Sequence, residues 1–267
     1  MLFRSEELKS GHHAKWRELS AEALQDAGQH ELLNWITLAG AMTELGKKAE
    51  VIYTYTDAEL QSTLKQIEAD GGRAIFVPCD VSSAESAEAL VSRTVEELGG
   101  IDHLVNNAAI YGSMEFNLLI SVDWDYYRRF MAVNLDGALV MTRAVHPEIA
   151  KRGGGAIVNQ SSTAAYLYSG FYGLAKAGIN SLTQQLAHEL GGQRIRVNAI
   201  APGPTDTEAT RTQAGDAAKD IVRNSLAIKR MGSVDDMVGA LLFLLSDDAS
   251  WVTGQILAVD GGQTFRL

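Results

Sequence analysis

Cysteine is nearly absent from this chain of 267 residues, which has a single thiol at Cys79. An internal disulfide is therefore excluded, and the apolar residues before Cys79 favour a buried, inert thiol in a reducing cytoplasm. No apolar run is long enough to span a bilayer, and Met1 to Ser20 lacks the charged and then apolar pattern of a secretory leader. We therefore expect a cytoplasmic protein without a membrane partner.

Positive charge is also scarce. The chain has 23 Lys and Arg residues against 33 Asp and Glu residues, which gives a formal net charge of −10 at pH 7. An acidic surface repels phosphate backbones and anionic lipids, so a nucleic-acid partner is excluded on the same ground as a membrane. By contrast, 46% of the residues are hydrophobic, which is enough for the core of one large α/β domain.

Residues 1–34 lack the blocks of Val and Ile that are typical of strands. Apolar residues at spacings of three and four instead predict two amphipathic helices on either side of Gly28. A rival interpretation makes Trp35 to Ala39 a strand, but the connection to the next strand would then be too short for a full crossover helix. We favour the helices and expect an atypical helical segment over residues 1–46.

Three histidines in this segment raise the question of a metal site. They are His12, His13 and His30, and no further ligand stands at a defined spacing from them. Exposed histidines are the simpler interpretation, so no metal site is predicted.

Residues 47–267 show strand patterns that alternate with helix patterns. A long helix is expected over Trp124 to Ala150, and Ser82 with Glu85 and Ser233 with Asp236 have the spacing of capping pairs. This order predicts one α/β domain with a doubly wound parallel sheet, similar to a Rossmann fold. The strand-like segments are Ala49 to Thr56, Arg73 to Pro78, Ile101 to Val105, Gly155 to Asn159, Arg194 to Ile200 and Gln255 to Val259.

Ser162, Tyr172 and Lys176 stand within one short span, where an apolar strand gives way to a helix. Tyr172 and Lys176 are four residues apart, so they share a helix face. A lysine ammonium beside a phenol favours the phenolate, which makes a tyrosine usable as an acid or base near neutral pH. Such a pair also occurs by chance in many helices, and the nearby serine strengthens the functional interpretation.

Three further segments accompany this span: LVNNAA (Leu104 to Ala109), MAVNLDGAL with Asn134, and NAIAPGPTDT (Asn198 to Thr207). Together with Ser162, Tyr172 and Lys176 they resemble the short-chain dehydrogenase/reductase family. The resemblance extends from about residue 47 to the C-terminus. It implies an oxidoreductase that transfers hydride between NAD or NADP and a small, apolar alcohol or ketone.

The resemblance also implies residue roles. Tyr172 would be the acid or base, Lys176 would lower its pKa and bind the nicotinamide ribose, Ser162 would bind the carbonyl oxygen, and Asn134 would support a relay water. Cofactor contacts carried over from the family begin with adenine and end with the nicotinamide carboxamide. They fall on Asp80, Val81, Asn107, Ala108, Ala109, Tyr172, Lys176, Pro202, Gly203, Thr205 and Thr207.

The chain departs from the family pattern in several places. Family members commonly begin with a strand and a TGxxxGxG turn that binds the pyrophosphate, and no such turn is present. Losing two charge-assisted hydrogen bonds of roughly 1.5–3 kcal/mol each predicts weakened cofactor binding. Either some part of residues 1–46 should pack in the space that the missing strand leaves at the sheet centre, or the strand edge there should be exposed and prone to aggregation.

Other departures affect selectivity. Tyr55 stands where an acid commonly selects NAD, so the preference between NAD and NADP cannot be read. The short interval between Ser162 and Tyr172 leaves Tyr166, Tyr168 and Phe171 as candidates for the substrate wall, and simple packing is an equally good interpretation for any one of them.

Two functions remain open on the sequence alone. The first is an active hydride-transferring oxidoreductase, and the alternative is a cofactor-impaired, catalytically silent member that acts as a binding or oligomer-forming protein. A dehalogenase-like relative is a distant third, since such proteins have arginine at the position of Lys176. The family resemblance also implies a homo-oligomer, a tetramer. The helices around Tyr126 to Val145 and Leu174 to Leu190 carry apolar residues on more than one face, so we expect them to form the interface.

Overall fold

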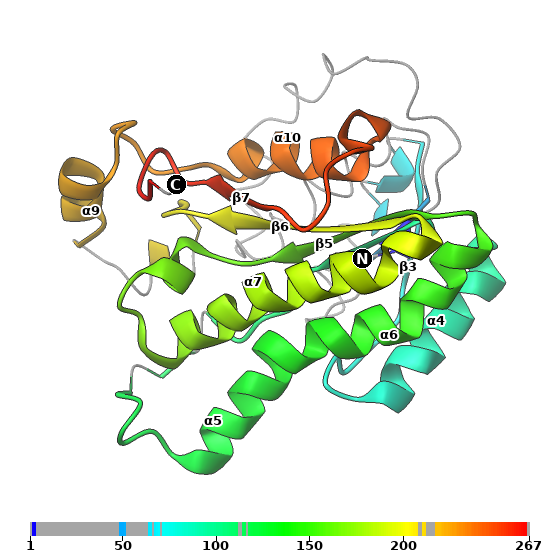
Figure 1. The fold of residues 1–267 in the computed structure, drawn as a ribbon, viewed down its shortest axis with the longest axis horizontal. Coiled ribbons are helices and arrows are strands. Elements are labelled where there is room, and N and C mark those ends of the chain that lie inside the picture. The colour runs from blue at the N-terminus through cyan, green and yellow to red at the C-terminus, as the bar shows by residue number, and fades with distance from the viewer. Residues whose placement is uncertain are drawn as a thin grey trace.

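The computed structural model describes residues 2–3, 48–51, 64–65, 67–69, 71–111, 114–115, 117–207, 210–211 and 217–265. Its centre is one seven-stranded sheet in the order β3-β2-β1-β4-β5-β6-β7 (Figure 1). Every pair that does not include β1 is parallel, so the predicted doubly wound parallel sheet is confirmed. The strands are β1 (Leu2–Phe3), β2 (Lys48–Val51), β3 (Arg73–Phe76), β4 (His103–Asn106), β5 (Gly155–Gln160), β6 (Ile195–Pro202) and β7 (Ile256–Val259).

Strand β1 fills the middle of the sheet and runs antiparallel to both of its neighbours, β2 and β4. The expectation that the first 34 residues contain no strand was therefore wrong for Leu2–Phe3, because two residues carry no periodicity from which a strand could be predicted. The expectation that part of residues 1–46 packs at the sheet centre is met by the same two residues. The predicted helices and the alternative strand from Trp35 lie outside the described residues.

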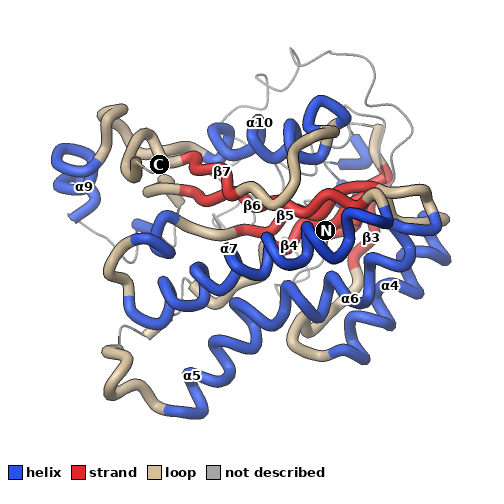
Figure 2. Tube along the Cα trace, viewed as in Figure 1, coloured by secondary structure: helices blue, strands red, loops and turns tan. Residues whose placement is uncertain are grey.

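Helices cover both faces of the sheet (Figure 2). One face packs against α4, α6 and α7, and the other packs against α10. Residues 124–151 form one continuous helical rod, as expected, but a π turn at Ala132–Asp136 separates α5 from α6. The helices are α4 (Ala84–Leu98), α5 (Trp124–Met131), α6 (Gly137–Lys151), α7 (Gly170–Leu190), α9 (Ala217–Ser225) and α10 (Val234–Leu245).

Local capping sets where the helices begin. The capping box of α10 is confirmed, because Ser233 and Asp236 each bond to the other's backbone N–H group. For α4 the expected pair was wrong by one residue: Ser83 caps the helix by accepting from the N–H of Ser86. Ser82 is not free for this role, since its hydroxyl donates to the Asp80 carboxylate at 2.6 Å.

Two apolar clusters hold the layers together. The larger one joins β4, β5 and β6 to α4, α6 and α7, with side chains such as Leu104, Ile157 and Val197 almost fully buried. The smaller one places Leu241 and Leu244 of α10 against Val158 on the opposite face of β5. Because both faces of β5 are covered, its carboxyl end is fixed in position, and the site described below begins there.

None of the helices in the described ranges has both the length and the apolar character that crossing a membrane requires.

Candidate active site

The segment from β5 to α7 carries the three residues that the sequence singled out. After β5 ends at Gln160, Ser162 stands in extended backbone and its hydroxyl accepts from the N–H of Ala164 at 3.1 Å. A short helical turn follows at Thr163–Tyr166, and α7 then begins at Gly170, whose φ of 59° favours glycine. Tyr172 and Lys176 lie one turn apart on α7, as their spacing predicted.

Lys176 is 3% exposed, and its ammonium group donates to the carbonyl oxygen of Gln160 at 2.8 Å. The nitrogen atom lies 5.8 Å from the centroid of the Tyr172 ring. Burial lowers the pKa of Lys176 to about 8, because a low-dielectric surrounding disfavours the charged form. The backbone of β5 therefore fixes the position of the lysine, and the site brings its proton within reach of physiological pH.

Tyr172 stands against an aromatic wall. The centroid of its ring is 5.2 Å from that of Tyr111 and 6.5 Å from that of Phe130, and Phe130 packs edge-to-face on Phe171 at 4.7 Å. These rings hold the tyrosine from the side of α5, so its orientation depends on the long helix as well as on α7.

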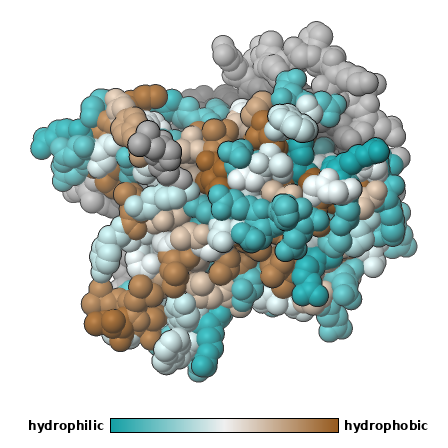
Figure 3. Space-filling view, in the orientation of Figure 1, coloured by the Kyte–Doolittle hydropathy of each residue, from teal (hydrophilic) through white to brown (hydrophobic). Residues whose placement is uncertain are grey.

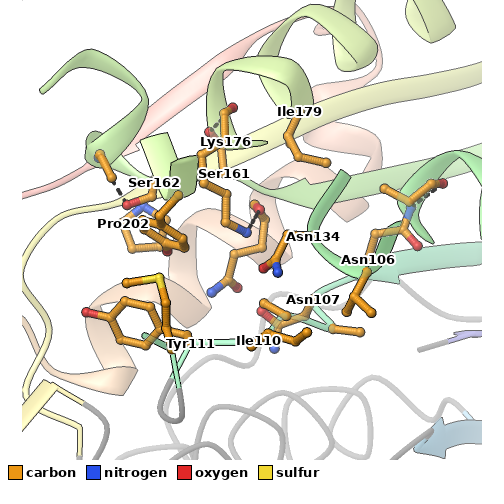
Figure 4. A pocket seen from close by; sticks show the side chains of 18 of the residues that line it. Asn106, Asn107, Ile110, Tyr111, Asn134, Ser161, Ser162, Lys176, Ile179 and Pro202 are labelled. Atoms are coloured by element: carbon orange, nitrogen blue, oxygen red, sulfur yellow. Dashed lines mark hydrogen bonds between the residues drawn. The ribbon is translucent and has the colours of Figure 1, made fainter. Parts of the chain in front are cut away.

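Asn134 lies inside the π turn and is 2% exposed. Its amide nitrogen donates to the carbonyl oxygen of Phe130 at 3.0 Å, while its side-chain oxygen has no hydrogen-bond partner among the described residues. π turns often occur at functional sites because they turn one residue out of the regular helix. Figure 4 shows Asn134 and Lys176 directed into the same cavity, with Asn107 nearby and Tyr111 on another side.

All thirteen residues that the sequence placed in the catalytic and cofactor sets line one cavity of about 1520 Å³. The cavity lies along the carboxyl ends of β3 to β6, where ligands bind in parallel sheets of this kind. The structure thus brings together Asn134, Ser162, Tyr172 and Lys176 with Asp80, Val81, Asn107, Ala108, Ala109, Pro202, Gly203, Thr205 and Thr207.

At the end of the cavity next to β3, Asp80 accepts from both the hydroxyl and the N–H of Ser82. These bonds hold the pKa of Asp80 below its ordinary value. Along the cavity, the side-chain oxygen of Asn107 is buried without a partner among the described residues. At the other end, Gly203 passes so close to Asp260 that a Cβ atom would lie 2.6 Å from its Cα. This part of the cavity therefore needs glycine.

Two of the three candidates for the substrate wall line the cavity, and the third does not. Tyr168 and Phe171 line the cavity, so they stay candidates. Tyr166 does not line the cavity, and its hydroxyl instead accepts from the amide of Asn180 at 2.5 Å. The prediction was wrong for Tyr166, since adjacent aromatic residues on a helical turn point in different directions.

Sequence reasoning missed several residues of the cavity. Tyr111 and Gln263 both line it, and the buried side-chain oxygen of Gln263 has no partner in the described part of the chain. Both stand in loops, where the sequence has no periodicity from which the direction of a side chain could be predicted. The pairing of Asn106 with Asn159 was also missed: the two share a register on β4 and β5, and the amide of Asn106 donates to Asn159 at 2.9 Å. Of the two, Asn106 lines the cavity and Asn159 does not. Two asparagines each ending an apolar strand were the available signal.

Comparison with known proteins decides the family. A family model described as enoyl-(acyl carrier protein) reductase matches residues 36–264. An uncharacterized oxidoreductase of Mycobacterium tuberculosis is 65% identical over 194 residues, which are 72% of this chain and 78% of that protein. The chain belongs to the short-chain dehydrogenase/reductase family.

Further members of the family agree with this assignment. An L-rhamnose 1-dehydrogenase (NAD(P)(+)) of a Sphingomonas species is 34% identical over 87% of this chain and 96% of its own. The crystal structure of a short-chain type dehydrogenase/reductase from Mycobacterium marinum superposes with a TM-score of 0.80 at 27% identity, over 90% of this chain and 93% of that chain. The family supports an NAD(P)-dependent oxidoreductase, and nothing in the comparisons supports the silent binding protein.

The described residues suit a short-chain dehydrogenase cofactor. The buried side-chain oxygens of Asn107 and Asn134 face the cavity lining without a hydrogen-bond donor among the described residues. Buried acceptors of this kind are rarely left unpaired unless a ligand or water binds them. The pyrophosphate turn of the family would fall within residues 4–47, outside the described residues, so the predicted weakening of cofactor binding stays a prediction. The position of Tyr55 lies outside them as well.

Proposed function

We propose that this protein interconverts a secondary alcohol and a ketone by hydride transfer, with Tyr172 as the acid or base. One observation carries the proposal: Ser162, Tyr172 and Lys176 line the same cavity, and a buried lysine amine stands 5.8 Å from the tyrosine ring. The relatives that bear names are oxidoreductases, which supports the same class of reaction.

The proton chemistry belongs to the chain's own side chains. Ser162 binds the substrate oxygen. The Tyr172 hydroxyl gives that oxygen a proton in reduction, and the Tyr172 phenolate removes a proton from it in oxidation. Lys176 stabilises the phenolate that is left. The unpartnered oxygen of Asn134 suits a water molecule that passes protons between Lys176 and solvent.

NAD or NADP supplies or accepts the hydride when bound. Asp80 and Val81 would contact its adenine, and Asn107, Ala108 and Ala109 would form the wall beside the adenosine. Pro202, Gly203, Thr205 and Thr207 would hold the carboxamide, and Lys176 would bind the ribose. The low pKa of Asp80 keeps a carboxylate acceptor ready for the amino group of adenine.

Turnover of Tyr172→Phe tests the proposal. With ketones and secondary alcohols as substrates and both dinucleotides as cofactors, we expect kcat to fall by about 10²–10⁴-fold, the usual contribution of general acid catalysis. Tyr166→Phe is the matched control, because Tyr166 does not line the cavity. The turnover of this variant should match that of the wild type. Near-normal turnover of Tyr172→Phe would remove this residue from the mechanism.

Fluorescence titration with NADH and with NADPH measures the cofactor preference and the strength of binding together. A dissociation constant in the millimolar range would agree with lost pyrophosphate contacts, since about 3–6 kcal/mol corresponds to a factor of about 10²–10⁴. Micromolar binding would show that residues 1–46 supply a phosphate site of their own.

A further inference from the structure

Two loops at the mouth of the cavity expose apolar side chains that the proposed chemistry does not use. The first loop leads into α5, and its Ile120 is 93% exposed. The second loop leads into α7, and its Tyr168 is 90% exposed. The apolar rim is the set of exposed apolar residues in these loops that also line the cavity: Leu118, Leu119, Ile120, Leu167 and Tyr168.

The two loops meet at their bases. A Cβ atom at Gly170 would lie 3.7 Å from the carbonyl oxygen of Asn117, so the second loop ends beside the first. Beneath them, Met114 and Phe171 are buried in one cluster with Phe130. Figure 3 shows apolar surface gathered at the lower left, around the beginning of α5. A cluster of buried side chains therefore supports the two loops of the apolar rim.

Polar groups at this mouth are largely paired with one another. The Glu115 carboxylate accepts from the Asn117 amide at 3.1 Å, and the Glu115 N–H donates to the hydroxyl of Tyr126. The exposed apolar side chains of the rim are therefore the main surface that this mouth offers to a ligand. Exposed apolar patches that continue into a cavity are typical of ligand-binding surfaces.

We infer that the apolar rim binds an extended hydrocarbon chain of the substrate, so that the natural substrate is a long-chain ketone or secondary alcohol rather than a small or polyhydroxylated one. This inference rests on the proposed function for the reacting end of the substrate. The rim residues and the Ser162–Tyr172 pair line the same cavity, so a chain that leaves the reacting carbon can extend through that cavity to the rim.

The test uses 2-butanone, 2-octanone and 2-dodecanone with NADH and NADPH. For the wild type we expect kcat/KM to rise with chain length by up to about fourfold per methylene, the factor for complete burial. Ile120→Ser and Tyr168→Ser should lower kcat/KM for 2-dodecanone by about tenfold or more and leave 2-butanone within about twofold. Ile228→Ser and Trp251→Ser are matched controls, since these exposed residues lie outside the cavity lining, and they should change neither value.

A second measurement does not depend on turnover. Equilibrium dialysis of 2-dodecanol should show binding that both rim variants weaken and both controls leave unchanged. Rim-dependent binding without turnover of any ketone would support the rim and refute the proposed function. Turnover without chain-length dependence would overturn the rim and leave the proposed function standing. A changed oligomeric state of Ile120→Ser, with an unchanged chain-length slope, would instead assign the rim to a second copy of the chain.

Discussion

Burial of the Lys176 side chain disfavours the charged form of its amine. Its pKa is lowered from 10.5 to about 8, so at neutral pH the folded protein holds a buried ammonium that donates to the Gln160 carbonyl. Below pH 8 the folded and unfolded states are both protonated, and the destabilisation is fully present. Between pH 8 and 10.5 the folded state has lost a proton that the unfolded state keeps, so the free energy of unfolding rises with pH.

Lys176→Met should remove this pH dependence. We expect the stability of the wild type relative to Lys176→Met to increase by up to about 3 kcal/mol between pH 7 and pH 10.5, at about 1.4 kcal/mol per pKa unit. Urea unfolding of both proteins at several pH values measures the difference, in which the titration of other groups cancels. A difference that stays constant across this range would mean that the Lys176 pKa is not shifted by folding.

At the scale of elements, two glycines in helix interiors should respond to alanine in opposite ways. At Gly137 of α6 a Cβ atom would lie 2.9 Å from Cγ2 of Val81, a stiff β-branched neighbour, so Gly137→Ala should destabilise by about 1–3 kcal/mol. At Gly239 of α10 an added Cβ atom would meet no other part of the described structure within 4 Å. Gly239→Ala should stabilise by about 0.5–1 kcal/mol, because alanine loses less backbone entropy. Thermal unfolding that moves in the same direction for both would contradict this reasoning.

How far the sequence predicted an element depends on how local its causes are. The capping box of α10 and the turn between Tyr172 and Lys176 follow from spacings within four residues, and both were predicted. The cap of α4 was missed by one residue, because two adjacent serines compete and the carboxylate of Asp80 decides between them. The π turn and strand β1 depend on contacts distant in sequence, which periodicity does not contain.

The candidate site divides in the same way. Residues at the ends of apolar strands were predicted because parallel strands bring their carboxyl ends to one edge of the sheet. Tyr111 and Gln263 reach the cavity from loops, and loop direction is set by packing. The aromatic contact between Tyr111 and Tyr172 could therefore be seen only in three dimensions.

For the whole molecule, the family resemblance predicts a homotetramer formed through the long helix and α7. Most apolar side chains of α7 are buried within the subunit, while Leu174 remains 45% exposed on its outer face. Leu174→Glu should shift the tetramer toward smaller species, since a charge in an apolar interface is unfavourable. Size-exclusion chromatography with light scattering at micromolar concentration measures this shift, with Ile228→Glu as the control. A wild-type protein that is a stable monomer would reject the prediction.

The π turn at Ala132–Asp136 also sets how far α5 is rotated relative to α6 about their common axis. One residue of an α-helix turns the chain by about 100°, so deleting Val133 would let α5 and α6 join as a regular helix and rotate α5 by about that angle. Phe130 would then leave Phe171 and Tyr172, although α6 would keep its place against the sheet. The length of this segment, more than its composition, keeps the aromatic wall facing the site, and we expect single-residue insertions and deletions here to abolish activity in a protein that still folds.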